Sequence, residues 1–151
     1  MNTKSDPKIL RVFTASISEE APGTLRRRVG AFLSHEGVPE DCDAFDAAAY
    51  VLSEWCTNVV RHAAEVTDVI KVTVVLSDSV IRIGVHDGDP HLPVAMPAEA
   101  EATHGRGLAI VRLFAKSLGG RTFAERTPDG GKTMWAVLPH GGVRATGMKA
   151  A

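Results

Sequence analysis

The sequence predicts an α+β fold, a two-layer sandwich in which three helices cover one face of a mostly antiparallel mixed sheet. Five stretches alternate apolar and polar residues with the period of a strand, and three repeat apolar residues with the period of a helix. Their order is β-α-α-β-β-loop-α-β-β, and strands joined by short turns pair antiparallel. The other face of the sheet is expected to be solvated or to contact a partner.

The first half of the chain predicts one strand and two helices. Residues 8–15 alternate as a strand. Pro22 opens a helix that Gly37 ends, and apolar residues recur along it at i, i+4, i+7 and i+8 from Leu25. The next helix extends from about residue 42 to residue 63, where several alanines favour helix and permit close packing.

The second half predicts two β-hairpins separated by a loop and a helix. The loop contains three prolines and has no clear period, which is typical of a functional lid or a disordered segment. The predicted elements are a hairpin of residues 70–76 and 81–85, the loop 88–104, a helix over 105–118, and a hairpin of residues 121–126 and 132–138.

Length and composition describe one soluble domain. The chain has 151 residues, of which 44% are hydrophobic and 23% charged, so it can build a core. We expect a single domain over residues 8–139, with flexible tails at 1–7 and 140–151. The formal net charge of -1 argues against long-range attraction to nucleic acid or an anionic membrane, and Arg26-Arg27-Arg28 indicates a solvated helix face.

Several sequence features favour a cytoplasmic location. No apolar run approaches the roughly 18 residues of a membrane-spanning helix, and the polar N-terminus does not look like a signal peptide. Cys42 and Cys56 form no CxxC pair, and the six histidines have no metal-ligand spacing. Cys56 is interpreted as a small buried hydrophobe. We therefore expect no disulfide and no zinc site.

The most informative stretch lies in the second predicted helix. Glu54, Asn58 and His62, which we call the polar row, are four residues apart and so share one helix face. Their neighbours are apolar, and a polar row among them is costly unless something polar fills the space in front of it. Asn58 offers an amide oxygen for Mg²⁺, and Glu54 could act as a general base. The alternative is a helix face that merely meets a polar loop.

Two further features point toward a nucleotide. Strand alternation places Asp87 on the buried face, where its carboxylate could accept from the amino group of adenine or cap a turn through Gly88-Asp89-Pro90. His104-Gly105-Arg106-Gly107-Leu108 stands at a helix start, where glycines and free N–H groups favour phosphate, although ordinary loop-to-helix transitions look similar. No GxxxxGK[ST] motif is present, which excludes a P-loop.

Taken as an ordered set, these motifs resemble the boxes of the GHKL, or Bergerat-fold, ATP-binding family. Residues 54–63 resemble the N box, residues 87–88 the start of G1, residues 105–108 the G2 box, and residues 130–133 with Trp135 the last box and final strand. The resemblance covers residues 8–139. Within the family it is strongest toward the small anti-sigma factor serine/threonine kinases and their regulatory ATP-binding relatives.

The resemblance implies ATP and Mg²⁺ as cofactors and a role for each matched residue. Glu54 would be the general base of phosphoryl transfer, and Asn58 would be the Mg²⁺ ligand. Asp87 would bind adenine. The other residues expected around the nucleotide are Arg61, His62, Gly88, Gly105, Arg106, Gly107, Leu108 and Thr133.

The resemblance also implies partners. The substrate would be a serine or threonine of an anti-sigma antagonist, and the other partner would be a sigma factor, with no direct contact to nucleic acid or membrane. Relatives often dimerise, so a homodimer is among the expectations. The chain ends soon after its last predicted strand, so we expect no transducer or dimerisation domain to follow.

One departure from the family leaves alternatives open. The G1 box of larger GHKL enzymes is DxGxG, whereas residues 87–91 are Asp-Gly-Asp-Pro-His and lack the glycines of that motif, so the nucleotide could be held more loosely. The leading hypothesis is a protein serine/threonine kinase that acts as a partner-switching anti-sigma factor. The alternatives are an ATP- or ADP-binding module that sequesters a partner without kinase activity, a detached histidine-kinase catalytic domain, and an α+β scaffold without nucleotide.

Overall fold

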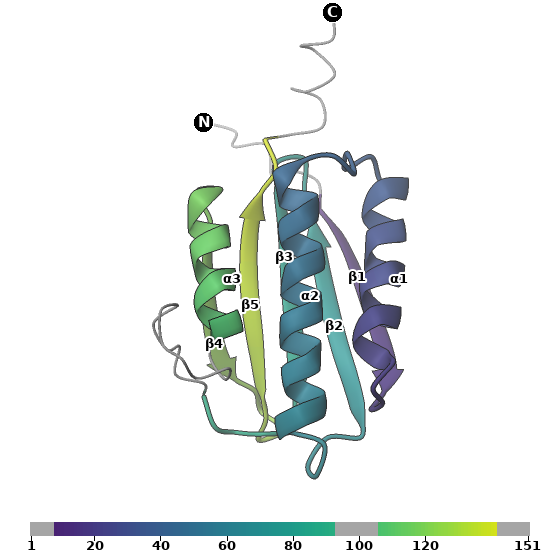
Figure 1. Cartoon of the computed structure of the whole chain (residues 1–151), viewed down its shortest axis with the longest axis vertical. Coiled ribbons are helices and arrows are strands. Elements are labelled where there is room, and N and C mark those ends of the chain that lie inside the picture. Colours follow the sequence, from purple (N-terminus) through teal and green to yellow (C-terminus); the bar gives the residue numbers. More distant parts are fainter. Residues whose placement is uncertain (1–7, 93–105, 142–151) are drawn as a thin grey trace, which may run out of the picture.

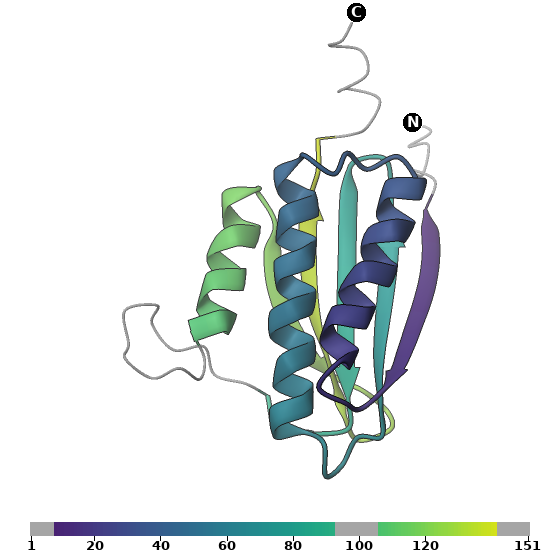
Figure 2. The same cartoon turned by 45° about the vertical axis from the view of Figure 1, so that its right-hand side comes forward.

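A five-stranded antiparallel sheet is covered on one face by three helices (Figures 1 and 2). The computed structural model describes residues 8–92 and 106–141. Each element begins and ends within two residues of its predicted bounds, so the predicted α+β two-layer fold is confirmed. The elements are β1 (Ile9–Ser16), α1 (Ala21–His35), α2 (Asp43–His62), β2 (Val69–Leu76), β3 (Val80–Asp87), α3 (Arg106–Ser117), β4 (Arg121–Arg126) and β5 (Lys132–Pro139).

The strand order is β1-β2-β3-β5-β4, and all four pairings between described strands are antiparallel. No parallel pair occurs among these strands, although the sequence left room for a mixed sheet. The reason is topological: the chain leaves β3, returns through α3 to the edge strand β4, and then inserts β5 between β3 and β4. The last strand thereby pairs with β3, and its start at Lys132 lies opposite the end of β3 at Asp87.

The core lies between the sheet and the helix layer. Alternate residues of β2 and β3 are fully buried, and α2, the central helix, packs against α1, α3, β3 and β5 (Figure 2). Burial of a side chain such as Leu52 or Ile83 stabilises the fold by roughly 1.5–3 kcal/mol. The predicted burial of Cys56 is confirmed, and burial raises the pKa of its thiol to about 12, so this cysteine is an unreactive core residue.

The opposite face of the sheet is not covered by helices and is partly apolar. Leu10 and Val12 of β1 are 63% and 48% exposed, and Phe123 of β4 stacks on Trp135 with a centroid distance of 6.5 Å.

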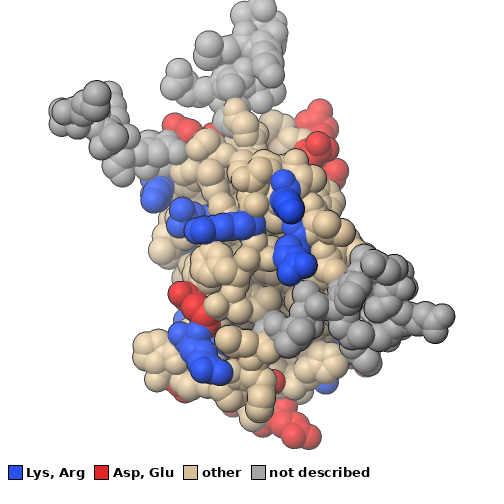
Figure 3. Space-filling view, turned by 90° about the vertical axis from the view of Figure 1, so that its left-hand side faces the viewer, with Lys and Arg blue, Asp and Glu red and all other residues tan. Residues whose placement is uncertain are grey.

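Basic side chains gather on the side of the molecule formed by α3 and β4, where Lys116 and Arg121 are exposed (Figure 3). None of the described helices is both long and apolar enough to cross a membrane.

Candidate functional site

Four elements meet at one end of the sandwich, which is the lower end in Figure 1. They are the C-terminal part of α2, the end of β3, the start of β5 and the N-terminus of α3. Helix α2 packs against the other three, and the β3–β5 register holds Asp87 opposite Lys132. The motifs that are far apart in the sequence therefore come together here.

The polar row lies on α2 beside the buried side chains that the sequence predicted. Val51, Leu52, Trp55 and Val59 are all buried on this helix. Glu54 and Asn58 are only partly exposed, whereas His62 and its neighbour Arg61 are exposed at the end of the helix. Solvent exposure therefore increases along the row from Glu54 to His62. Glu54 and Asn58 are the members that could contact a ligand in a partly buried position.

Tyr50 extends the row by one turn, and sequence reasoning missed it. It precedes Glu54 by four residues and is partly exposed. Burial and the negative charge of Glu54 raise the pKa of Tyr50 above its ordinary value of 10.0. The same four-residue spacing that singled out the other three could have revealed it.

Glu54 lies against the first turn of α3. A Cβ atom placed on Gly107 would come within 2.1 Å of Glu54 Oε2, so any side chain at position 107 would displace the carboxylate. The structure therefore brings the N-box carboxylate and the G2 glycine into direct contact. The first N–H groups of a helix have no intrahelical partner, so the N-terminus of α3 is suited to an anion such as phosphate. The Glu54 carboxylate lies beside this helix end.

The other G2 residues are described to different extents. Arg106 is the first residue of α3, and Leu108 is partly buried against the core. Gly105 and His104 lie outside the described residues, as does most of the loop predicted between residues 88 and 104.

Asp87 is buried on the helix side of the sheet, as strand alternation predicted, with 5% of its surface exposed. The Lys132 ammonium donates to Asp87 Oδ1 at 3.0 Å and to the Asp89 carbonyl oxygen at 3.0 Å. The backbone N–H of Asp89 donates to the same Oδ1 at 2.8 Å. The carboxylate therefore caps the turn that follows β3, as the alternative interpretation proposed, and also forms a buried ion pair that the sequence did not indicate.

The register of β5 determines which residue shares the face of Asp87. Lys132 is opposite Asp87, whereas Thr133 is opposite His86. Successive side chains point to opposite faces of a strand, so Thr133 lies on the far side of the sheet. Thr133 was expected near the adenine that Asp87 would bind, whereas the register places Lys132, and not Thr133, beside Asp87. A shift of one residue cannot be read from a Gly-Gly-Lys-Thr sequence without the pairing.

Gly88 is required by a close approach of two loops. A Cβ atom at this position would lie 2.3 Å from the carbonyl oxygen of Val66, and the Gly88 N–H donates to Thr67 Oγ1 at 2.8 Å. The following turn is held by Asp89, whose carboxylate accepts from the backbone and ring of His91. These hydrogen bonds lower the pKa of Asp89. The G1 segment therefore keeps a defined turn without the family's glycines.

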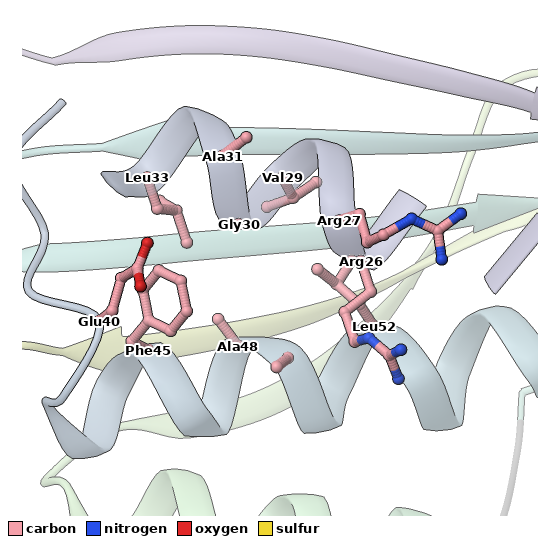
Figure 4. Close-up of a pocket in the computed structure, with 11 residues that line it drawn as sticks. Arg26, Arg27, Val29, Gly30, Ala31, Leu33, Glu40, Phe45, Ala48 and Leu52 are labelled. Atoms are coloured by element: carbon pink, nitrogen blue, oxygen red, sulfur yellow. The ribbon is translucent and has the colours of Figure 1, made fainter. Parts of the chain in front are cut away.

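A groove of about 390 Å³ lies elsewhere, between α1 and α2 (Figure 4). Arg26 and Arg27 lie at one end of it and Glu40 and Phe45 at the other, with Ala48 between. No residue of the polar row lines it, and neither Asp87 nor Gly107 does. We therefore do not assign the nucleotide to this groove.

The described residues suit a nucleotide-bound metal better than a protein-only metal centre. No group of three His, Cys, Asp or Glu side chains in residues 8–92 and 106–141 could hold a metal ion. Mg²⁺ commonly takes only one or two protein ligands together with phosphate oxygens and water. Asn58, one helical turn from Glu54, fits such a role, so the residues present are compatible with Mg-ATP.

Comparison with known proteins identifies the family. A family model described as a histidine kinase-like ATPase domain matches residues 15–136. The chain belongs to this family. The GHKL resemblance of the motifs is thereby confirmed for this ATPase domain, and the matched range includes the polar row, Asp87 and Gly107.

The ATPase domain is also similar to a solved structure. This is the crystal structure of the RsbU and RsbW domains of Rv1364c from Mycobacterium tuberculosis, with a TM-score of 0.61 and 19% sequence identity. The match covers 86% of this chain and 32% of that chain. At this identity the similarity shows a shared fold. A search of curated proteins returned no match.

Proposed function

We propose that this domain binds Mg-ATP at the α2–β3–α3 end of the sandwich and phosphorylates a serine or threonine of a protein partner in the cytoplasm. The partner is an anti-sigma antagonist, and the domain acts as a partner-switching anti-sigma factor. The observation that supports this most directly is the contact of the Glu54 carboxylate with Gly107. It sets a proton acceptor beside a helix N-terminus suited to phosphate.

Each residue then has a defined task. Glu54 accepts the proton of the attacking hydroxyl, and Asn58 supplies an oxygen to the metal. Asp87 accepts from the adenine amino group, Gly88 keeps the turn beside it, and the backbone from Gly105 to Leu108 surrounds the phosphates. Arg61 and His62 lie at the open end of the row. When bound, Mg-ATP would supply the phosphoryl group, and its metal ion would offset the negative charge of the phosphates. The main contribution of the protein is then to position the reacting groups.

Glu54→Ala tests the catalytic assignment. The purified domain is incubated with γ-labelled ATP, Mg²⁺ and protein fractions of its native host, and label on serine or threonine is mapped. We expect the substitution to reduce transfer by roughly 10²–10⁴-fold, because general-base catalysis is lost, and to change ATP affinity little. Glu65→Ala removes an exposed carboxylate just after α2 and is the matched control.

Transfer by Glu54→Ala at the wild-type rate would contradict the assignment. If the wild-type domain binds ATP but labels no protein, the second candidate function holds, namely a nucleotide-binding module that sequesters its partner. Two observations favour that candidate: residues 87–91 lack the G1 glycines, and Asp87 is already paired with Lys132.

A further inference from the structure

Asp87 and Lys132 form an ion pair in which both charged side chains are almost completely buried. The two side chains are 6% and 9% exposed, and they lie on the helix side of the sheet at the end of β3. Burying a lysine is expensive unless its charge is paired and its N–H groups are bonded. The pair also lies where the proposed function requires recognition of a nucleobase, so its remaining hydrogen-bonding groups matter.

The bonds of the Asp87 carboxylate leave one oxygen for a ligand. Among the described residues, both hydrogen bonds to it end on Oδ1, one from Lys132 Nζ and one from the Asp89 N–H. Oδ2 therefore remains able to accept. An ionised carboxylate cannot donate, so its ligand group must be a donor.

The Lys132 ammonium similarly keeps one donor. It has three N–H groups, and within the described part of the chain two are directed to Asp87 Oδ1 and the Asp89 carbonyl oxygen. The second of these bonds joins the start of β5 to the turn after β3 and holds the ammonium beside the carboxylate. The third N–H is a cationic donor in the same ion pair as the Oδ2 acceptor.

We propose that Lys132 is a specificity-determining residue that donates to ring nitrogen N1 of adenine while Asp87 accepts from the adjacent amino group. This inference rests on the proposed function. Adenine presents a donor, the exocyclic amino group, directly beside an acceptor, N1, and the Asp87–Lys132 pair presents the complementary acceptor and donor. Guanine presents an acceptor and then a donor along the same edge, so it would have to bind in a shifted position.

The test compares ATP with 1-deaza-ATP, in which a C–H replaces N1. Affinities are measured by calorimetry for the wild type and for Lys132→Met. We expect the wild type to prefer ATP by roughly tenfold or more, because a hydrogen bond to a charged donor is lost in the analogue. We expect Lys132→Met to bind both nucleotides with equal affinity. Lys116→Met removes an exposed lysine of α3 and should keep the wild-type preference.

The outcomes separate the inference from the function on which it rests. If the wild type binds ATP and 1-deaza-ATP within twofold of each other, Lys132 is only a structural partner of Asp87, and the inference is overturned although ATP binding stands. Tighter binding of GTP than of ATP would overturn it as well. If the wild type binds no nucleotide, both proposals fail.

Loss of Lys132 leaves a buried carboxylate without its cation, so Lys132→Met can unfold. Lys132→Arg keeps the charge and the donors. This variant is expected to retain at least part of the preference for ATP over 1-deaza-ATP. Even if neither variant folds, the wild-type comparison can still overturn the inference, since it requires no substitution.

Discussion

Two single contacts bring together the candidate site residues of this ATPase domain. The contact of Glu54 with Gly107 and the bond of Lys132 to Asp87 each join segments that are more than 40 residues apart in the chain. Both contacts lie on the helix side of the sheet. The Glu54 carboxylate can occupy its position because residue 107 is a glycine and has no side chain. The Asp87 carboxylate is held by the Lys132 ammonium.

Gly107→Ala should separate positioning from folding. The new Cβ would clash with the end of the Glu54 side chain, which can rotate away, so the melting temperature should change little. Phosphoryl transfer should fall by roughly 10²-fold, because a displaced base no longer meets the hydroxyl. Gly30→Ala is the matched control, since its Cβ would have an ordinary 3.6 Å contact with Phe45. Unchanged transfer by Gly107→Ala would show that Glu54 need not occupy its present position.

At the scale of elements, the β4–β5 turn is connected by hydrogen bonds to β3 and so helps to position the candidate site. Asp129 accepts hydrogen bonds from the Thr127 hydroxyl and from the Gly131 N–H, and His86 Nε2 of β3 lies 3.0 Å from its Oδ2. These contacts connect the turn to the strand that ends at Asp87. They hold the start of β5, and therefore Lys132, in register with β3.

The pKa of Asp129 predicts an acid-sensitive contribution of this turn to stability. Hydrogen bonds from Thr127 and Gly131, with a smaller contribution from His86, lower the pKa of Asp129 from 3.8 to about 2. Folding therefore favours the ionised form. The contribution is complete above pH 3.8 and is lost as the pH falls toward 2.

Urea unfolding of Asp129→Asn measures that contribution. The wild type should have the higher urea midpoint above pH 3.8, and the difference should shrink toward zero near pH 2. Asp78→Asn, in the β2–β3 turn, controls for the loss of an exposed carboxylate. A difference that stays constant from pH 5 down to pH 2 would rule out this role for Asp129.

For the whole molecule, the site lies where the helix layer, the sheet and the N-terminus of α3 converge, so a ligand there stabilises all of them together. Mg-ATP at 100 times its dissociation constant should stabilise the native state by about 2.7 kcal/mol. For a domain of this size we expect a rise in melting temperature of roughly 5–10 °C. Asp87→Asn should reduce that rise. Thermal unfolding with and without Mg-ATP provides the measurement, and no shift at millimolar Mg-ATP would favour a scaffold without nucleotide.

The homodimer stays a prediction. The uncovered face of the sheet exposes Leu10, Val12 and Phe123, which is apolar surface available for association. The sequence could not assign that surface, because an edge strand and a central strand have similar patterns. The strand order shows that β1 and β4 are the two edges.

The fold and the main components of the site were predictable from the sequence because they depend on local periods. A period of two gave the strands, the four-residue spacing gave the polar row, and strand alternation put Asp87 on the buried face, all of which the structure confirms. Tyr50 was missed although the same spacing reveals it. Gly107 was singled out for phosphate, but its contact with Glu54 depends on how α2 packs against α3.

What only the tertiary structure decided is which residue faces Asp87. Thr133 and Lys132 are neighbours in the sequence, and only the pairing of β5 with β3 assigns Lys132 to the helix side and Thr133 to the far side. Periodicity within a strand fixes the alternation but not which strand is the neighbour or in which register, because register depends on side-chain packing across the whole sheet. The sequence by itself thus determined a histidine kinase-like ATPase fold with a buried carboxylate at the end of β3, and the β3–β5 pairing determined that this carboxylate is bound to a lysine.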